Sequence, residues 1–276
     1  MNAAQTPPSP TDALALLFAK LCLAAGPIAM EVFPREDQGA RLKDDRSPVT
    51  EADERVEAFL IGELNRLLPQ YPCIAEESSA RGETPAQSGA FILIDPLDGT
   101  REFVARRPEF TINIALVENG APTAGAVYAP ALGEIWFAGA AAFYAKAPPG
   151  GPFPTREEWR RLRVRAAPKD GLVALVSRSH LDAETEGFLA RLPVKSRADA
   201  GSSLKFCRIA EGVADIYPRF GPTNEWDTAA ADAVLRAAGG AVLTPGGGPL
   251  VYGKKALNYR NGPYIAVGDP ALASFC

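Results

Sequence analysis

The segment of residues 91–100 constrains the fold more than any other, because four apolar residues suited to a buried strand lead directly into a tight turn with two carboxylates. Pro96 fixes its own φ and Gly99 can adopt a positive φ, so the turn can aim Asp95, Asp98 and the Leu97 carbonyl at one point. Oxygen ligands of this kind suit hard divalent cations. An isolated Asp-x-x-Asp pair is more often an ordinary solvated turn, so the pair alone leaves both interpretations open.

Three further acidic segments favour the metal site. Glu76 and Glu77 end a short apolar segment upstream, Asp53 lies at the start of a helical pattern, and Asp227 opens another such pattern near the C-terminus. In this order the four segments resemble the motifs of the lithium-sensitive, magnesium-dependent phosphatase superfamily. That superfamily includes inositol monophosphatases, fructose bisphosphatases and 3′(2′),5′-bisphosphate nucleotidases, and the resemblance spans nearly the whole chain from about residue 12.

Shorter segments narrow the resemblance to one kind of phosphatase. Residues 201–207 and 214–223, with 127–130, 177–180 and 100–103, are similar to the bisphosphate nucleotidases of the CysQ type. The resemblance implies hydrolysis of adenosine 3′,5′-bisphosphate to AMP and phosphate, and also action on 3′-phosphoadenylyl sulfate, as the family does in sulfur assimilation. Lithium inhibition is expected.

Two alternatives stay open. An inositol or sugar phosphatase could carry the same metal site, and substrate profiling would separate it from a nucleotidase. A non-catalytic nucleotide or metal sensor is the alternative of another class, but a sensor would not need Thr100 beside five acidic residues.

The expected fold class is α/β, with an α+β N-terminal half and an α/β C-terminal half. The resemblance implies an inositol-monophosphatase-like layered αβαβα sandwich with the site between the halves. Residues 1–10 are polar and Pro-rich, which predicts a disordered lead before a helix capped by Thr11 or Asp12. Residues 11–165 should form the N-terminal domain with most metal ligands, and residues 166–276 the C-terminal domain with Asp227 and the specificity residues.

Hydrophobic periodicity predicts the main elements within these halves. Residues 53–68 have helical spacing, and residues 91–143 read as antiparallel strands joined by turns such as Asn119-Gly120. The Pro- and Gly-rich residues 146–159 predict a loop. Beyond it, the same periodicity predicts a strand over 172–177 and helices over 183–191, 204–210 and 227–238, the last ending at Gly239-Gly240.

Composition fits an enzyme that acts on a small molecule. Apolar residues make up 47% of the 276 residues, enough to build full cores, and a net charge of −4 with one His argues against a nucleic-acid binder. The basic residues 160–165 alternate like an exposed strand edge. The four cysteines, at 22, 73, 207 and 276, show neither close pairing nor metal-ligand spacing, which fits a reducing cytoplasm.

Neither a signal peptide nor a membrane span is expected, because no basic region precedes the first apolar run and Lys20 interrupts residues 14–30. Peripheral association with the inner membrane has been attributed to CysQ-type relatives, but no feature of this sequence predicts it. The oligomeric state is not predicted.

The resemblance implies a ligand set of Glu76, Asp95, Asp98 and Asp227, completed by the Leu97 carbonyl. Four carboxylates balance two Mg²⁺ ions and leave them able to accept a phosphate, and the family implies two or three ions per site. A soft metal is disfavoured, because the cluster offers no Cys or His.

The resemblance also implies the catalytic roles. The Thr100 hydroxyl would hydrogen-bond to the attacking water, and Asp53 or Glu76 would accept its proton. The amides of Gly99 and Thr100 could bind a phosphate oxygen. Glu77 could support the ligands or be an ordinary surface charge, and it stays outside the ligand set.

The second phosphate of the substrate would be held by His180, Ser202, Lys205 and Arg219, alongside Asp227. Without the resemblance, a lone His is more often structural and a helical Lys more often solvated.

Two further positions qualify this picture. Ala231 stands where relatives usually have Gly, and its methyl could crowd the helix near the base or sugar. Residues 248–255 almost match a nucleotide-binding phosphate loop, but Lys255 replaces the required Ser or Thr, so they predict a surface turn.

Overall fold

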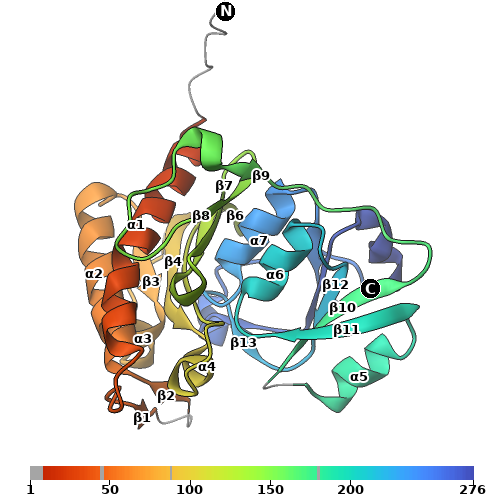
Figure 1. Ribbon diagram of the computed structural model, residues 1–276, viewed down its shortest axis with the longest axis horizontal. Coiled ribbons are helices and arrows are strands. Elements are labelled where there is room, and N and C mark those ends of the chain that lie inside the picture. Colours follow the sequence, from red (N-terminus) through yellow and green to blue (C-terminus); the bar gives the residue numbers. More distant parts are fainter. Residues whose placement is uncertain (1–8, 44–46, 88, 179–180) are drawn as a thin grey trace, which may run out of the picture.

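The computed structural model describes residues 9–43, 47–87, 89–178 and 181–276 (Figure 1). Its largest element is a seven-stranded sheet in the order β3-β4-β5-β6-β7-β8-β9, in which β3 is parallel to β4 and all other neighbours are antiparallel. The strands are β3 (Cys73–Ala75), β4 (Ala90–Asp98), β5 (Thr111–Glu118), β6 (Ala121–Ala129), β7 (Glu134–Ala138), β8 (Ala142–Lys146) and β9 (Arg160–Arg161). The predicted turn at Asn119-Gly120 joins β5 to β6.

A five-stranded sheet follows in the order β11-β10-β12-β16-β14. Strands β11, β10 and β12 are parallel, whereas β16 runs antiparallel to both of its neighbours. The strands are β10 (Leu172–Ser177), β11 (Val194–Ala200), β12 (Ile216–Arg219), β14 (Ala241–Leu243) and β16 (Tyr264–Val267). Two small antiparallel pairs complete the strands: β1 (Arg41–Leu42) with β2 (Pro48–Val49), and β13 (Thr223–Asn224) with β15 (Arg260–Asn261).

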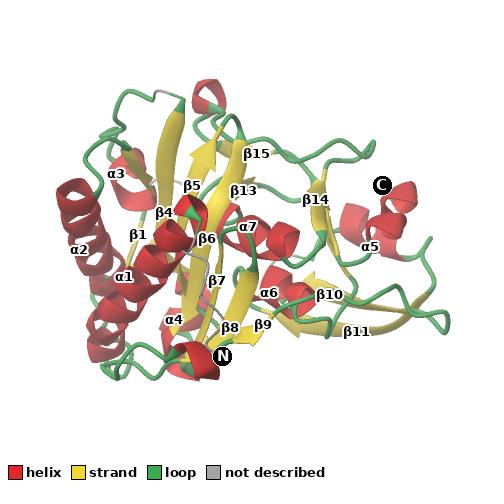
Figure 2. Cartoon of the chain, turned by 90° about the horizontal axis from the view of Figure 1, so that it is seen from above, coloured by secondary structure: helices red, strands yellow, loops and turns green. Residues whose placement is uncertain are grey.

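Helices alternate with the two sheets to give five layers (Figure 2). Helices α1 and α2 cover one face of the seven-stranded sheet, α6 and α7 fill the space between the sheets, and α5 lies on the outer face of the five-stranded sheet. The helices are α1 (Pro10–Val32), α2 (Glu51–Leu67), α3 (Glu76–Ala80), α4 (Thr100–Val104), α5 (Ala183–Leu189), α6 (Leu204–Ala210) and α7 (Ala229–Ala237). The predicted αβαβα sandwich is therefore confirmed.

Strand alternation determines which side of β4 carries the acidic residues. Phe91 and Leu93 pack into the core shared with α6 and α7, whereas Ile92 and Ile94 pack against α1 and α2. Successive side chains of a strand point to opposite faces, so Asp95 continues the Phe91 and Leu93 face and points toward the α7 layer.

A β-bulge keeps the second aspartate on that same face. Asp95 pairs with Asn113 and Asp98 pairs with Thr111, so three steps along β4 match two steps along β5. Without the extra residue, positions i and i+3 would point to opposite faces; with it, both carboxylates share one face. Gly99 then adopts a φ of 95°, as the sequence predicts, and turns the chain into α4. The predicted tight turn directly after residue 94 is wrong, because β4 continues through Asp98 and its bulge brings the two carboxylates to one face.

Several boundaries differ from the predictions. The predicted disorder of residues 1–10 mostly lies outside the described residues, and the cap of α1 is Ser9, whose side chain accepts from the Asp12 amide, rather than Thr11 or Asp12. Helix α7 begins at Ala229 and not at residue 227, because residues 225–228 form a loop that holds Asp227. The predicted division at residue 165 falls between β9 and β10. The core around α6 and α7 nevertheless draws residues from both sides, and the division stays a prediction.

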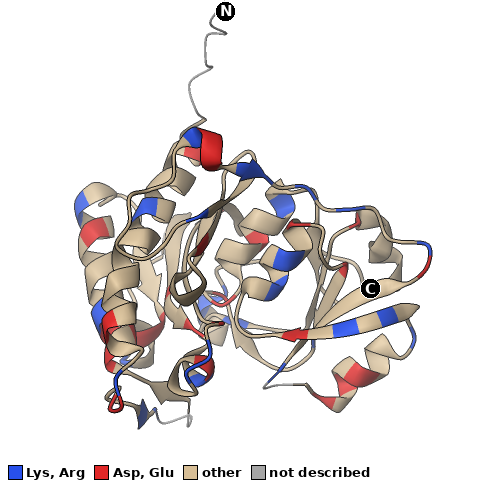
Figure 3. Ribbon diagram, in the orientation of Figure 1, with Lys and Arg blue, Asp and Glu red and all other residues tan. Residues whose placement is uncertain are grey.

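Helix α1 is long and apolar enough, by length and composition, to cross a membrane, with a mean hydropathy of 2.0 in its most apolar window. Half of that window is buried, and Phe18, Cys22 and Ala29 belong to the core formed with α2 and the seven-stranded sheet. The helix therefore packs as a core helix of a folded domain. Lys and Arg residues are spread over elements of both halves (Figure 3). The predicted exposed strand edge of residues 160–165 is confirmed only for Arg160 and Arg161, which form β9, because Arg165 is partly buried and pairs with Asp215.

Candidate active site

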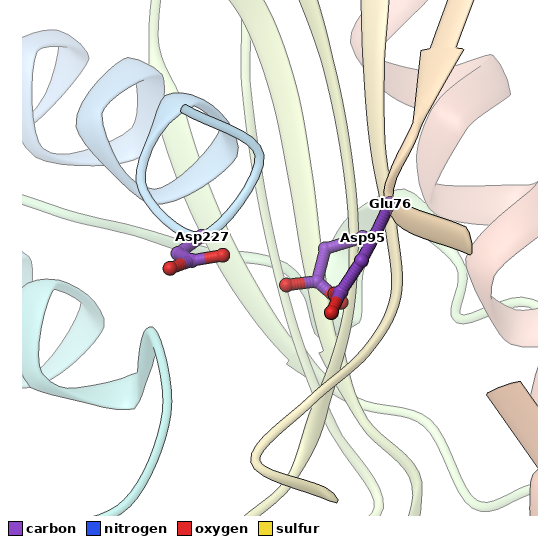
Figure 4. Close-up of side chains that lie close together, drawn as sticks. All are labelled: Glu76, Asp95 and Asp227. Atoms are coloured by element: carbon purple, nitrogen blue, oxygen red, sulfur yellow. The ribbon is translucent and has the colours of Figure 1, made fainter. Parts of the chain in front are cut away.

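Three carboxylates from three separate segments converge where the two halves meet (Figure 4). One oxygen of each of Glu76, Asp95 and Asp227 lies within 4.8 Å of the others. Glu76 follows β3 and Asp95 lies in β4; because Ala75 pairs with Ile94 in this parallel pair, the next residues of both strands lie side by side. Asp227 reaches them from the loop before α7, which packs on β5 and β6.

Asp98 borders this group on the side of the C-terminal half. Its carboxylate accepts the Ser203 amide at 2.5 Å, and the Ser203 hydroxyl donates to Asn113 Oδ1 at 3.0 Å. The buried ammonium of Lys205 lies close enough to lower the pKa of Asp98, but burial raises that pKa more, to about 7. Asp98 therefore interacts both with the acidic group and with Lys205 of the C-terminal half.

Burial and mutual repulsion dominate the electrostatics of these acids. Desolvation raises the pKa of Asp95, and the charges of Glu76, Asp98 and Asp227 raise it further. The pKa of Asp227 is also raised, by burial and then by Asp98 and Glu76. Clustered carboxylates of this kind are stabilised by divalent cations, and the all-oxygen donor set fits a hard ion.

Asp53 and Thr100 form a hydrogen-bonded pair beside the acidic group. Thr50 and Asp53 make a capping box at the start of α2, in which Asp53 Oδ2 accepts the Thr50 amide at 2.8 Å and its hydroxyl at 2.6 Å. The other oxygen, Oδ1, accepts the Thr100 hydroxyl at 3.1 Å. Burial raises the pKa of Asp53 to about 6, which suits a group that exchanges protons near neutral pH.

A buried carboxylate that the sequence prediction missed fixes the position of Glu76. Glu57 of α2 accepts the Glu77 and Ser78 amides at 2.7 Å each and the Ser78 hydroxyl at 2.6 Å, and so holds the first turn of α3. Lys43 donates to Glu76 at 2.7 Å and to Glu77 at 2.6 Å. Glu77 is only 4% exposed, so the surface-charge interpretation of Glu77 is wrong.

A second buried carboxylate fixes the position of Asp227. Glu225 accepts the Gly253 amide at 2.6 Å and the Lys254 amide at 2.8 Å, and it also pairs with the Lys254 ammonium. Asp227 Oδ2 accepts the Asn224 amide at 2.8 Å. The turn that imitates a phosphate loop in the sequence therefore uses its amides to anchor a protein carboxylate.

A cleft of about 570 Å³ opens from the acidic group into the C-terminal half. Its lining contains the predicted substrate-binding residues Gly99, Thr100, Ser202, Lys205, Arg219 and Asp227. Lys205 is 4% exposed rather than solvated, donates to the carbonyls of Ala200 and Ser202, and lies 5.0 Å from the centre of the Tyr217 ring. Burial lowers the pKa of Lys205 to about 8.

The remaining predicted positions have mixed outcomes. His180 lies outside the described residues. Ala231 is fully buried in the core around α7 and is absent from the described lining of the cleft, so its methyl group does not crowd a ligand there. Tyr217 and Tyr264 line the cleft and were not predicted, because their apolar neighbours are typical of an ordinary buried strand.

Comparison with known proteins shows that the sequence is similar to those of phosphatases. The model of the inositol monophosphatase family matches residues 12–269. The chain is 40% identical over 237 residues to the 3′(2′),5′-bisphosphate nucleotidase CysQ of Escherichia coli K12, covering 84% of this chain and 91% of that protein. The CysQ nucleotidase of Haemophilus influenzae is 30% identical over 88% of both chains.

Solved structures give the same grouping. The crystal structure of CysQ from Bacteroides thetaiotaomicron aligns with a TM-score of 0.77 at 34% identity, covering 93% of this chain and 97% of that one. The inositol monophosphatase of Thermotoga maritima aligns with a TM-score of 0.76 at 26% identity, covering 96% and 95%. Backbone similarity alone therefore does not separate nucleotidases from inositol phosphatases.

Proposed function

The chain belongs to the inositol monophosphatase family, and on that premise we propose that it removes the 3′-phosphate of adenosine 3′,5′-bisphosphate to leave AMP and inorganic phosphate. It is a 3′(2′),5′-bisphosphate nucleotidase of the CysQ type, as its relatives of 30% to 40% identity are. The observation that carries the proposal is the group of Glu76, Asp95 and Asp227, which opens into a cleft with a buried Lys205.

Glu76, Asp95, Asp98 and Asp227, with the Leu97 carbonyl, would hold two or three Mg²⁺ ions. Bound ions would supply positive charge to the phosphate oxygens and make water a better nucleophile at neutral pH. The protein contributes a fixed constellation of ligands, because the β-bulge, Glu57 and Glu225 each restrain a different segment. This restraint supports the ligand roles of these residues.

The hydroxyl of Thr100 would orient the attacking water, and Asp53 would take the proton through that hydroxyl. Thr100 lines the cleft and contacts Asp53, whereas Asp53 itself is 1% exposed. A proton accepted at Asp53 therefore stays out of contact with solvent. Glu76 pairs with Lys43, which makes it less available as a base than Asp53.

The cations of the C-terminal half would hold the second phosphate without cleaving it. Lys205 and Arg219 both line the cleft, and both are buried, so their interactions with an anion would be screened little by water. Ser202, at a left-handed φ of 46°, lies in the loop before α6 and also lines the cleft.

The test is phosphate release by the purified protein with Mg²⁺ from adenosine 3′,5′-bisphosphate, 3′-phosphoadenylyl sulfate, inositol 1-phosphate and fructose 1,6-bisphosphate, each with and without Li⁺. We expect lithium-sensitive release mainly from the two nucleotides. A preference for inositol 1-phosphate would retain the metal site but overturn the specificity assignment. Nucleotide binding without any release would favour the sensor alternative.

We also propose a cytoplasmic location. The four cysteines are all free, and Cys22 and Cys207 are buried, so none of them indicates an oxidising compartment.

A further inference from the structure

A second cavity meets the main cleft at the acidic group. It has a volume of about 530 Å³ and shares Ser47, Glu76, Asn224 and Arg260 with the lining of the main cleft. A phosphate held at Glu76 would therefore border two spaces. The main cleft extends toward the predicted nucleotide-binding residues, whereas the second cavity extends toward the loop that contains Lys255 and Tyr259.

The second cavity is positively charged. Its lining contains the cations Lys43, Lys255 and Arg260. Lys43 is already paired with Glu76 and Glu77. Lys255 and Arg260 are exposed, and neither forms an ion pair with a carboxylate in the part of the chain that the structure describes. Two uncompensated cations thus lie beside a centre that handles phosphate.

The loop that forms the cavity carries features of a binding surface. Trp226 and Tyr259 line the cavity, and their Nε1 and Oη atoms are buried without hydrogen-bond partners among the described residues, which is uncommon in folded proteins. Asn258 and Tyr259 adopt left-handed φ values of 50° and 58°. Consecutive non-glycine residues in this region are strained, and such strain collects at ligand sites.

We propose that this cavity is a subsite for inorganic phosphate, where the product dianion binds after it leaves the acidic group. The inference rests on the proposed phosphatase function for the source of the phosphate, but the subsite itself needs only the cations and the cavity. Lys255 and Arg260 would contact the dianion, and the loop of Tyr259 would hold them in place.

Such a subsite would change the order of product release. The nucleoside monophosphate occupies the main cleft, so a phosphate that could leave only by that route would have to wait for it. A second space at Glu76 lets phosphate depart first. Phosphate in solution would reach the same subsite, so added phosphate is a valid probe.

The test is binding of inorganic phosphate to the metal-free protein in EDTA at constant ionic strength, measured by calorimetry. Without divalent cations the carboxylates repel phosphate, so binding reports cationic surfaces. All variants are made in a Lys205→Met background, which removes a buried cation of the main cleft. In that background we compare Lys255→Ala with Lys169→Ala, an exposed lysine that lines neither cavity. Lys255→Ala should weaken phosphate binding about threefold to tenfold, and Lys169→Ala should leave it unchanged.

Three results would overturn the subsite: no measurable binding to the Lys205→Met protein, which would place the anion in the main cleft; equal loss in Lys255→Ala and Lys169→Ala; or no loss in Lys255→Ala. The measurement needs no turnover, so it stands even if the protein proves inactive on every nucleotide. Circular dichroism and melting temperature confirm that each variant is folded.

Discussion

The N-terminal half holds its proposed metal ligands at the ends of two paired strands, whereas the C-terminal half presents its cleft residues from loops, the short α6 and the end of β12. Glu76 follows β3, and Asp95 and Asp98 lie in the last part of β4; the register of these strands places them side by side. Lys205 is the second residue of the seven-residue α6, and Ser202 lies in the loop before that helix. The first arrangement fixes a ligand geometry, while the second allows the cleft to vary around it.

Relatives that share the fold illustrate the consequence of this difference. The CysQ and inositol monophosphatase structures align with nearly equal TM-scores of 0.77 and 0.76, although their names differ in substrate. The layers therefore support the chemistry common to both kinds of protein. Substrate choice must lie in cleft side chains, most of which come from the C-terminal half.

Both halves nevertheless contain a buried carboxylate that accepts two backbone amides beside a proposed metal ligand. Glu57 holds two backbone amides just after Glu76, and Glu225 holds two backbone amides and so fixes the segment just before Asp227. A buried carboxylate that accepts two amides is well satisfied, and it would restrain the neighbouring proposed metal ligand without touching the substrate.

The largest effect is expected at Asp95, the proposed metal ligand whose charge interacts with all of the other acidic residues of the site. Asp95→Asn should lower kcat by at least about a thousandfold, because it removes one charge from the cation site. The melting temperature of the metal-free protein should rise, because burial and three neighbouring acids oppose the charge of Asp95. Retained activity at saturating Mg²⁺ would remove Asp95 from the ligand set.

Thr100→Ala should have the next largest effect, a loss of about a hundredfold in kcat with little change in KM, because the hydroxyl would act on the attacking water rather than on bound substrate. Thr155→Ala, in a capping box remote from the cleft, is the matched control. An effect confined to KM would make Thr100 a binding residue.

Substitution of Glu57 and Glu225 tests whether these buried carboxylates hold the proposed metal ligands in place. Glu57→Gln and Glu225→Gln should each raise the Mg²⁺ concentration for half-maximal activity by about tenfold, with partial recovery at high Mg²⁺. A merely structural role would lower stability without this recovery. If only one variant showed the shift, the two halves would differ in how their ligands are held.

Lys205→Met should have a smaller and more selective effect that separates the halves. KM for adenosine 3′,5′-bisphosphate should rise about tenfold, with less change for a monophosphate substrate, because the removed cation would hold the phosphate that is not cleaved. Equal changes for both substrates would place Lys205 outside the specificity set.

The smallest effect concerns the pH dependence of stability. The pKa of Asp53 rises to about 6 and those of Asp98 and Glu77 to about 7, so the folded state holds these protons more tightly than the unfolded state. The stabilisation that these three carboxyl groups give the folded state is fully present below the pKa values they have in the unfolded chain. It is lost as the pH rises through 6 to 7. The melting temperature of the metal-free protein should therefore fall by roughly 5 °C between pH 5.5 and 7.5, and Mg²⁺ should flatten that slope.

The C-terminal elements show where prediction from sequence was weaker. Helix α6 matches its predicted bounds, but β11 was not predicted, because it is an edge strand with mostly exposed polar residues and no apolar alternation.

Glu57 and Glu225 were missed for a different reason. Their partners are backbone amides 20 to 29 residues away, and amides are present in every residue, so no residue type marks them.

The sequence alone determined the buried strand that leads to Asp95, the positive φ of Gly99, the helix that starts beside Asp53 and the identity of the acidic residues, because local backbone preferences and residue chemistry act over a few positions. Only the tertiary structure decided that Asp95 and Asp98 share a face, since the bulge exists only in the pairing with β5. It also decided that Lys205 is buried and that a second cavity adjoins Glu76. Burial and cavities arise from packing between distant segments, which local sequence does not specify.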